Sequence, residues 1–422
     1  MQVPQEIANT IVDPAAYAQE KPVDEAFTWL RANAPFAQMQ PDGYMPIWVA
    51  TRQADIQNIE LRTDVFSSAQ RLPTVTPDAV LRAREESKFT GIRTLVSMDD
   101  PDHVEFRRLT RSWFLPKNLN NLEPRIREIA RASVDRMAEL GGECDFSREI
   151  ALMYPLRVIM EILGVPQTDE ALMLKLTQEF FGTRDPELNR EGGDAANDPV
   201  RAQQALQSTM AQMTDYFVAL IESRQRNPTS DLASVVANGR IHGAPISTGD
   251  ALGYYIITAT AGHDTTSSTT SVGMWTLAER PDLLQTLRAD PSLIRAFIDE
   301  EVRWASPVKH FMRTATQDIE IAGQQVHKGD WVMLSYASGN RDEKVFDRPF
   351  EFDIHRKPNR HISFGYGPHV CLGQALGMME MRIFWEELLP RLKSVELTGL
   401  PARMLSNFVC GPKAVPIRYE FI

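Results

Sequence analysis

Apolar residues recur at helical spacing along most of this chain. The clearest repeat runs from Ile126 to Leu140 and stops at the Gly141-Gly142 pair. Other helix-compatible runs cover residues 146–163, 168–182, 201–225 and 248–279. Strand-like runs are fewer and lie near residues 36–50, 313–337 and 403–420. The pattern predicts a mainly α protein with a smaller β region.

Two irregular segments interrupt the helical pattern. Residues 70–97 contain Pro73 and Pro77 without a clear period, which predicts a long loop with a short helix. Residues 185–199 are polar and rich in Gly, Pro, Asp and Asn, and they predict a flexible connection between two helices. No linker divides the chain and no internal repeat is evident. We therefore expect a single domain over residues 1–422.

Composition and charge exclude several classes of protein. The 422 residues are 43% hydrophobic and 24% charged, as in ordinary globular proteins. A net charge of −11 gives no general attraction to nucleic acid or to anionic membranes. No run of about 20 apolar residues predicts a membrane-spanning helix, and the first residues do not have the pattern of a signal peptide. The three cysteines lack zinc or Cys-x-x-Cys spacing, so we expect a cytoplasmic protein with no membrane or nucleic-acid partner.

The strongest chemical signal is the segment H-I-S-F-G-Y-G-P-H-V-C-L-G at residues 361–373. It fits the pattern F-x-x-G-x-x-x-C-x-G, which holds Cys371 in a tight glycine-lined loop directly before a helix-compatible run. The free N–H groups at a helix N-terminus favour a thiolate over a thiol. Axial ligation of haem iron is one of the few tasks for such a thiolate. The alternative is a buried structural cysteine in an ordinary turn.

A second candidate site, A-T-A-G-H-D-T-T-S-S, lies inside the helical run 248–279. Gly262 costs about 1 kcal/mol relative to Ala within a helix, and its lack of a side chain would let a flat ligand approach the backbone. Thr265 lies four residues after Ala261, so its hydroxyl or an inserted water competes for the Ala261 carbonyl. The alternative is a solvent-exposed helix face rich in hydroxyl groups. We interpret His263 as structural rather than as an iron ligand.

Two charged pairs have helical spacing. His103 and Arg107 are four residues apart and share one helix face, where they could clamp a carboxylate. Glu300 and Arg303 are three apart in the sequence E-x-x-R. Each pair taken alone is common on solvated helices and contributes little there.

In this order along the chain, these motifs resemble those of the cytochrome P450 family. The resemblance implies the cytochrome P450 fold, a helix-rich triangular prism that encloses haem b (iron protoporphyrin IX), with Cys371 as the proximal ligand of the metal. It also implies an O2-dependent monooxygenase. In that reaction Thr265 would hydrogen-bond dioxygen and Asp264 would help to deliver protons.

The resemblance also assigns residues to the haem and to the substrate. The residues expected to contact haem are His103, Arg107, Ala261, Gly262, Arg313, His361, Phe364, Gly365, His369, Cys371 and Gly373. The residues expected to line the substrate pocket are Ile257, Ala261, Val308, His310, Phe311, Asn407 and Phe408, with part of 70–97. Residues 185–199 would form a mobile lid. Glu300, Arg303 and Arg356 would maintain the fold.

Substrate and electron donors follow from the same resemblance. Stretches such as S-P-V-K-H-F-M-R-T-A and P-N-R-H-I-S-F-G are similar to the bacterial α-terpineol-hydroxylating P450 subfamily. They imply a monocyclic monoterpenoid substrate such as terpineol or cymene, with small aromatic hydrocarbons as the alternative. Electrons would come from a [2Fe–2S] ferredoxin and a separate NAD(P)H-dependent flavin reductase. Ferredoxin would dock on a basic patch of Arg107, Arg108, Arg111, Arg356, Lys357 and Arg360.

Two other functions are compatible with a cysteine-ligated haem. A peroxide-driven peroxygenase is disfavoured by Asp264 and Thr265, because peroxide users of the family typically lack this pair. A non-catalytic haem-binding or gas-sensing protein is the alternative from another class. No appended DNA-binding or signalling domain supports it.

Overall fold

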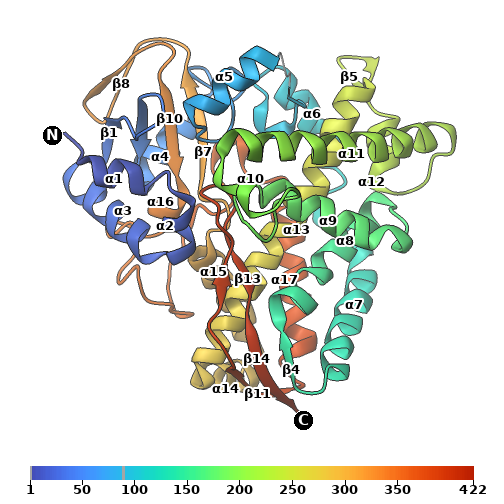
Figure 1. Cartoon of the computed structure of the whole chain (residues 1–422). Coiled ribbons are helices and arrows are strands. Elements are labelled where there is room, and N and C mark those ends of the chain that lie inside the picture. Colours follow the sequence, from blue (N-terminus) through green and yellow to red (C-terminus); the bar gives the residue numbers. More distant parts are fainter. Residues whose placement is uncertain (1, 88–90) are drawn as a thin grey trace.

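A computed structural model describes residues 2–87 and 91–422 of the chain. Figure 1 shows a body made mostly of helices, with the larger sheet placed beside the N-terminal helices. The expected mainly α architecture with a smaller β region is confirmed. Within the described residues, no helix combines the length and the apolar character needed to cross a membrane.

The helices follow the predicted runs closely. In chain order they are α1 (Gln5–Thr10), α2 (Pro14–Gln19), α3 (Lys21–Asn33), α4 (Gln53–Leu61), α5 (Asp78–Ser87), α6 (Asp102–Arg111), α7 (Pro116–Glu139), α8 (Met153–Leu163), α9 (Glu170–Phe181), α10 (Gly193–Asn197), α11 (Pro199–Arg226), α12 (Leu232–Ala237), α13 (Thr248–Glu279), α14 (Pro281–Ala289), α15 (Ile294–Ala305), α16 (Tyr336–Gly339) and α17 (Gln374–Leu388).

The larger sheet has five strands in the order β1-β2-β10-β7-β3. Their bounds are β1 (Phe36–Met39), β2 (Ile47–Ala50), β10 (Trp331–Ser335), β7 (His310–Ala315) and β3 (Phe66–Ser67). A second sheet joins β11 (Leu392–Leu397), β14 (Pro416–Phe421) and β4 (Glu143–Asp145). Three two-stranded ribbons pair β5 (Arg240–Ile241) with β6 (Ala244–Pro245), β8 (Ile319–Ile321) with β9 (Gln324–Val326), and β12 (Ala402–Arg403) with β13 (Pro412–Ala414).

Helix α13 is the long central helix on which the site is built. Ser247 caps its start by accepting a hydrogen bond from the backbone N–H of Asp250 at 3.1 Å. The hydroxyl-rich stretch stays helical because its side chains bond back to the turn before them. Thr269 and Thr270, for example, each donate to the carbonyl four residues earlier, at 2.8 and 2.9 Å. Most of this stretch is buried, so the expected alternative of a solvated helix face is wrong.

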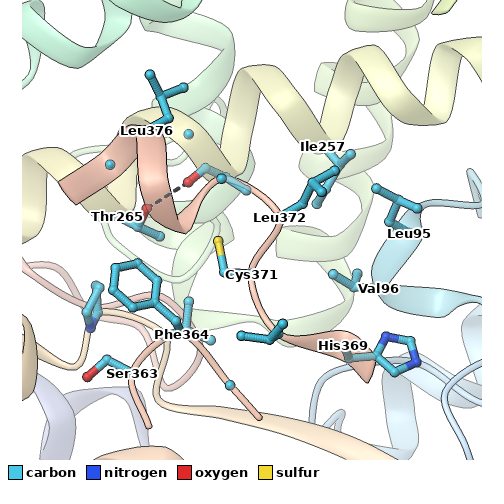
Figure 2. A pocket seen from close by; sticks show the side chains of 18 of the residues that line it. Leu95, Val96, Ile257, Thr265, Ser363, Phe364, His369, Cys371, Leu372 and Leu376 are labelled. Atoms are coloured by element: carbon cyan, nitrogen blue, oxygen red, sulfur yellow. Dashed lines mark hydrogen bonds between the residues drawn. The ribbon is translucent and has the colours of Figure 1, made fainter. Parts of the chain in front are cut away.

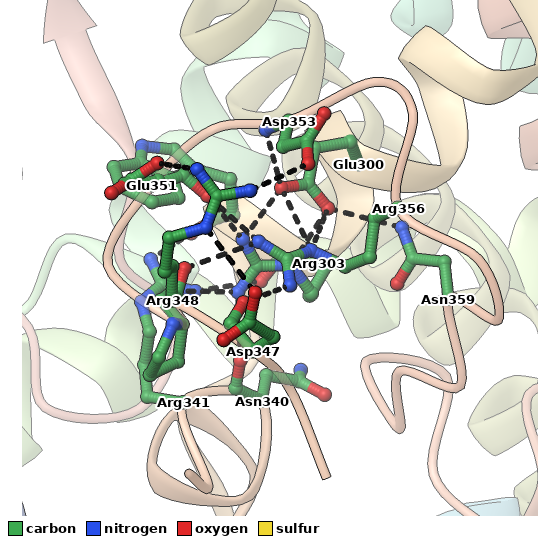
Figure 3. A network of polar contacts seen from close by, with 12 residues as sticks. Glu300, Arg303, Asn340, Arg341, Asp347, Arg348, Glu351, Asp353, Arg356 and Asn359 are labelled. Carbon is green, nitrogen blue, oxygen red and sulfur yellow. Dashed lines mark hydrogen bonds and ion pairs between the residues drawn. The ribbon is translucent and has the colours of Figure 1, made fainter.

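The Glu300–Arg303 pair lies at the centre of a buried polar network (Figure 3). Arg303 donates to both oxygens of Glu300 at 2.6 and 2.7 Å, and both side chains are inaccessible to solvent. Arg356 and Asn359 donate to the same carboxylate at 3.3 and 3.0 Å. Arg303 also donates to the carbonyl oxygens of Asn340 and other loop residues. The network fastens α15 to the loop that leads to Cys371.

The segment expected to be a flexible lid is held more firmly than its composition suggests. Asp185 is completely buried and forms an ion pair with Lys413 at 3.0 Å. Its carboxylate also accepts a hydrogen bond from the backbone N–H of Leu405 at 3.0 Å. The short helix α10 orders much of the remainder. Of the other irregular segment, residues 78–87 form α5 and residues 88–90 lie outside the described residues.

Candidate active site

Two adjacent cavities form the candidate site. The first, of about 250 Å³, lies between α13 and the loop that carries Cys371 (Figure 2). The second, of about 780 Å³, extends towards α5, α9 and α11. The residues that line both cavities are mostly apolar: Val96, Ile257, Ala261, Thr265, Val308 and Phe311. The two cavities therefore share part of their walls.

Cys371 projects into the first cavity from its loop (Figure 2). Its backbone N–H donates to the carbonyl of Phe364 at 2.8 Å, which closes the loop. Gly365 and Gly367 have φ angles of 72° and 65°, a conformation that favours glycine. Cys371 is an exposed residue that lines this cavity. Gly373 lies close behind it, because a Cβ there would be 4.0 Å from the Sγ atom.

The electrostatic balance at Cys371 differs from the prediction. Burial raises the pKa of the thiol above its ordinary value. The backbone N–H groups of Gly373 and Gln374 and the charge of Arg107 act in the opposite direction but do not reverse the shift. The helix N-terminus alone therefore does not supply a thiolate. A bound metal ion would, because a coordinating thiol is deprotonated outright.

A group of basic side chains lines one side of the first cavity: His103, Arg107, Arg313 and His369. The two imidazole rings stack with their centroids 3.8 Å apart. Burial, reinforced by Arg313, lowers the pKa of His369 to about 2, and burial also lowers the pKa of His103. Both rings are therefore neutral, and the positive charge comes from the two arginines. Arg107 is oriented by donating to the carbonyl of Val370 at 2.9 Å.

Within the described part of the cavity lining, little negative charge balances this basic group, although Asp100, outside the lining, lies 3.7 Å from Nδ1 of His103. Among the residues lining the cavity, the carboxyl groups are those of Glu60 and Glu380. Glu60 accepts a hydrogen bond from Tyr336 at 2.6 Å and lies 3.7 Å from Arg313. Burial raises its pKa to about 7, so its charge is only partial at neutral pH. The group fits a ligand that brings its own carboxylates, as haem does with its two propionates.

His361, expected to contact haem, does not line either cavity. The charged side chains that influence it, Asp299 and Arg303 among them, belong to α15. Burial lowers its pKa to about 4. His361 precedes the turn into the Cys371 loop, and its contact with haem stays a prediction.

On α13, the expected residues face the cavity with one exception. Ala261, Gly262 and Thr265 line it, opposite Cys371. Gly262 is also needed for helix packing, because a Cβ there would lie 2.4 Å from Cδ1 of Ile159 on α8. Asp264 does not line either cavity, although it is adjacent to Thr265 in sequence.

The expected substrate residues divide by strand alternation. Phe311 and Arg313 share one face of β7 and line the cavities, whereas His310 points to the opposite face. Its Nε2 accepts from the N–H of Val75 at 3.0 Å and its Nδ1 lies 2.9 Å from the carbonyl of Asn407. His310 is therefore a buried cross-link, and its assignment to the pocket is wrong. Ile257, Val308, Asn407 and Phe408 line the cavities as expected.

Leu95 and Val96 enter the cavities from a short 3-10 turn within residues 70–97, the segment that was expected to contribute to the pocket. Phe180 and Phe181, at the end of α9, were not predicted. Their apolar character is common to any core residue, so the sequence carries no specific signal for them. Glu60 follows two buried isoleucines on α4 and resembles an ordinary solvated helix position.

The basic patch expected to dock ferredoxin has fewer exposed members than predicted. Arg107 is turned into the cavity, and Arg356 is buried against Glu300 with a side chain only 7% exposed. The remaining members, Arg108, Arg111, Lys357 and Arg360, are exposed. Arg108 forms an ion pair with Glu105 at 2.7 Å.

Comparison with known proteins gives consistent similarities. The family model for cytochrome P450 matches residues 81–415. "Cytochrome P450-terp" of a Pseudomonas species is 45% identical over 99% of this chain and 98% of its own length. Linalool 8-monooxygenase of Pseudomonas putida is 34% identical over 95% of this chain and 96% of its own length. The crystal structure of CYP108D1 from Novosphingobium aromaticivorans has a TM-score of 0.91 and 39% identity, and the match covers 100% of both chains.

Proposed function

This chain belongs to the cytochrome P450 family, and on that premise we propose that it hydroxylates a monocyclic monoterpenoid such as terpineol or cymene. Members of the family are monooxygenases that bind haem b through a cysteine thiolate. Relatives with this coverage are named as monooxygenases, which supports an enzyme over a haem-based sensor. When bound, haem supplies the centre at which O2 is activated.

In this proposal Cys371 is the metal ligand and the basic group holds the propionates. Arg107 and Arg313 supply the positive charge, while neutral His103 and His369 supply hydrogen bonds. His369 is held by its contact with Ser68 at 3.3 Å and by stacking on His103.

The substrate proposal rests on one observation above all: apolar side chains line the junction of the two cavities. Ile257, Ala261, Val308 and Phe311 line both cavities together with Thr265. A compact hydrocarbon body is the ligand that such walls bind best, and a chamber of about 780 Å³ is in the usual range for small ligands. The names of the P450-terp and linalool 8-monooxygenase relatives support a terpenoid.

Small aromatic hydrocarbons are the second candidate, because aromatic rings line part of the chamber. Phe311 and Phe408 meet edge to face with centroids 5.4 Å apart, and Phe181 lies 6.3 Å from Phe408. Edge-to-face contacts of this kind would accept another planar ring.

Two electrons are needed in each catalytic cycle, and a P450 of this soluble bacterial type receives them from redox partners. We propose a [2Fe–2S] ferredoxin reduced by a separate flavin reductase. The exposed cations Arg108 and Arg111 at the end of α6 offer a docking surface of the right sign for an acidic ferredoxin.

Optical titration of the ferric enzyme tests the substrate. Terpineol and cymene should shift the Soret band from low spin to high spin at lower concentrations than naphthalene or biphenyl do. Product analysis with ferredoxin, reductase and NAD(P)H should then give a hydroxylated terpenoid. A tight shift and product with the aromatic set alone would replace the terpenoid proposal by the second candidate.

A further inference from the structure

His263 on α13 is buried and points away from the cavity. Its Nε2 atom lies 2.8 Å from the carbonyl oxygen of Leu152, just before α8. A carbonyl oxygen can only accept a hydrogen bond, so Nε2 must carry the hydrogen. In the neutral ring, Nδ1 is then a lone-pair acceptor that needs a donor.

The group opposite Nδ1 is also an acceptor. Oδ2 of Asp264 lies 3.6 Å from Nδ1 of His263. Neither atom has a hydrogen-bond partner, and both are out of contact with water. Two buried acceptors that face one another without a donor carry a substantial free-energy cost. A proton on either the imidazole or the carboxyl makes that group a donor to the other, and a small closure of the 3.6 Å separation then removes the cost.

We propose that His263 and Asp264 share one proton and act together as the proton donor beside Thr265. His263 is a positioning residue in this role, because it acts only through Asp264. The Asp264 side chain is 8% exposed while its Oδ2 is buried, so its remaining atoms keep the contact with water. One oxygen of the carboxyl group faces Nδ1 of His263, and because Asp264 lines neither cavity, a proton leaving the pair reaches the cavity through water.

The number of protons consumed by hydroxylation sets how many protons His263 and Asp264 must deliver in each turnover. Hydroxylation of a C–H bond consumes O2, two electrons and two protons and yields the alcohol and one water. In this proposal each proton passes from the pair through water to the oxygen atom that reacts beside Thr265, and a proton taken up from solvent restores the pair, so that the two protons consumed come from solvent. The inference rests on the proposed role of Asp264, and the experiment separates the two.

The test is a double-mutant cycle with His263→Gln, Asp264→Asn and the double variant. Gln at 263 can still donate to the Leu152 carbonyl but cannot share a proton. With loading confirmed by the CO-difference spectrum, we expect Asp264→Asn to slow product formation by about a hundredfold and His263→Gln by about tenfold. The double variant should be no slower than Asp264→Asn, because the pair acts as one unit.

Each other outcome has a definite meaning. Full activity of Asp264→Asn would remove the proposed role of Asp264 itself. If product formation is slow in Asp264→Asn but normal in His263→Gln, the shared proton alone is overturned. The same holds if the rate losses of the two single variants multiply in the double variant. His327→Gln is the matched control, because His327 forms an exposed pair with Asp318 at 3.4 Å, and it should leave turnover unchanged.

A second measurement does not depend on the folding of His263→Gln. In the ferrous CO-bound enzyme, which is diamagnetic, nitrogen-15 labelling of histidine reports the state of each ring nitrogen. One histidine Nδ1 should show a proton-sharing hydrogen bond, and its signal should move in Asp264→Asn. If none of the histidine signals responds to Asp264→Asn, the proposal is overturned.

Discussion

Thr265 donates a hydrogen bond of 2.7 Å from Oγ1 to the carbonyl oxygen of Ala261, one turn earlier in α13. The bond fixes the hydroxyl at the wall of the cavity opposite Cys371. With its hydrogen engaged, the hydroxyl oxygen presents lone pairs to the cavity, where they can hold a water or a protonated oxygen species. The hydroxyl of Thr265 also competes with the backbone N–H of the same residue for the Ala261 carbonyl.

Replacement of Thr265 by alanine should uncouple electron use from hydroxylation. Without the hydroxyl, the water that carries protons into the cavity loses its fixed position, so reduced oxygen escapes as peroxide. We expect product per NAD(P)H to fall by about tenfold while NAD(P)H oxidation continues. The measurement is the ratio of product to peroxide. Thr265→Ser retains the hydroxyl and should stay coupled, and a fully coupled alanine variant would contradict the assigned role.

Glu60 should make stability depend on pH near neutrality. Burial raises its pKa from 4.5 to about 7, against the opposing effects of Arg313 and Tyr336. Between these two values the folded state keeps a proton that the unfolded chain has lost. The contribution of Glu60 to stability therefore falls as pH rises from 4.5 to about 7, by about 3 kcal/mol in total. Propionates beside Arg313 would raise this pKa further, so the sign stays the same with haem bound.

The variant Glu60→Gln isolates this contribution. Because glutamine does not titrate, the variant should gain thermal stability over the wild type as pH rises from about 5 to about 8. Below the lower end of that window the difference between the two should become constant. Glu128→Gln, at a position 63% exposed, is the control and should follow the wild type at every pH. Parallel curves for wild type and Glu60→Gln would contradict the assignment.

The limits of the sequence analysis have physical causes at particular residues. The run predicted at 248–279 coincides with α13, which Ser247 caps at its start. His310 and Phe311 were assigned to one pocket, yet adjacent residues of a strand face opposite sides. His361 lies in an irregular loop, where no period tells which way a side chain points. Glu60 reaches the cavity only through tertiary packing, so no local sequence pattern predicts its position there.

Phe408 should control the size of substrate that the chamber accepts. Its ring contacts Phe311 and Phe181 at centroid distances of 5.4 and 6.3 Å and covers part of the chamber wall. Phe408→Ala removes this apolar contact, so we expect terpineol to bind roughly tenfold more weakly, while bulkier hydrocarbons bind more tightly. Soret titration measures both. Phe350→Ala, at a surface position 42% exposed, should change neither affinity, and unchanged terpineol binding in Phe408→Ala would remove Phe408 from the pocket.

Charge reversal at Arg111 should slow electron delivery without disturbing the substrate site. Arg111 is exposed in the last turn of α6. The first turn of the same helix carries His103, a member of the basic group that lines the first cavity. An acidic ferredoxin would be repelled by Arg111→Glu, so we expect ferredoxin-supported reduction to slow by about tenfold at low salt, with the difference shrinking as salt rises. Stopped-flow reduction under CO measures the rate, and Soret titration checks that substrate affinity is unchanged. Arg226→Glu is the control, because it reverses an exposed charge at the end of α11. If both variants are reduced at the wild-type rate, ferredoxin does not dock at this end of α6.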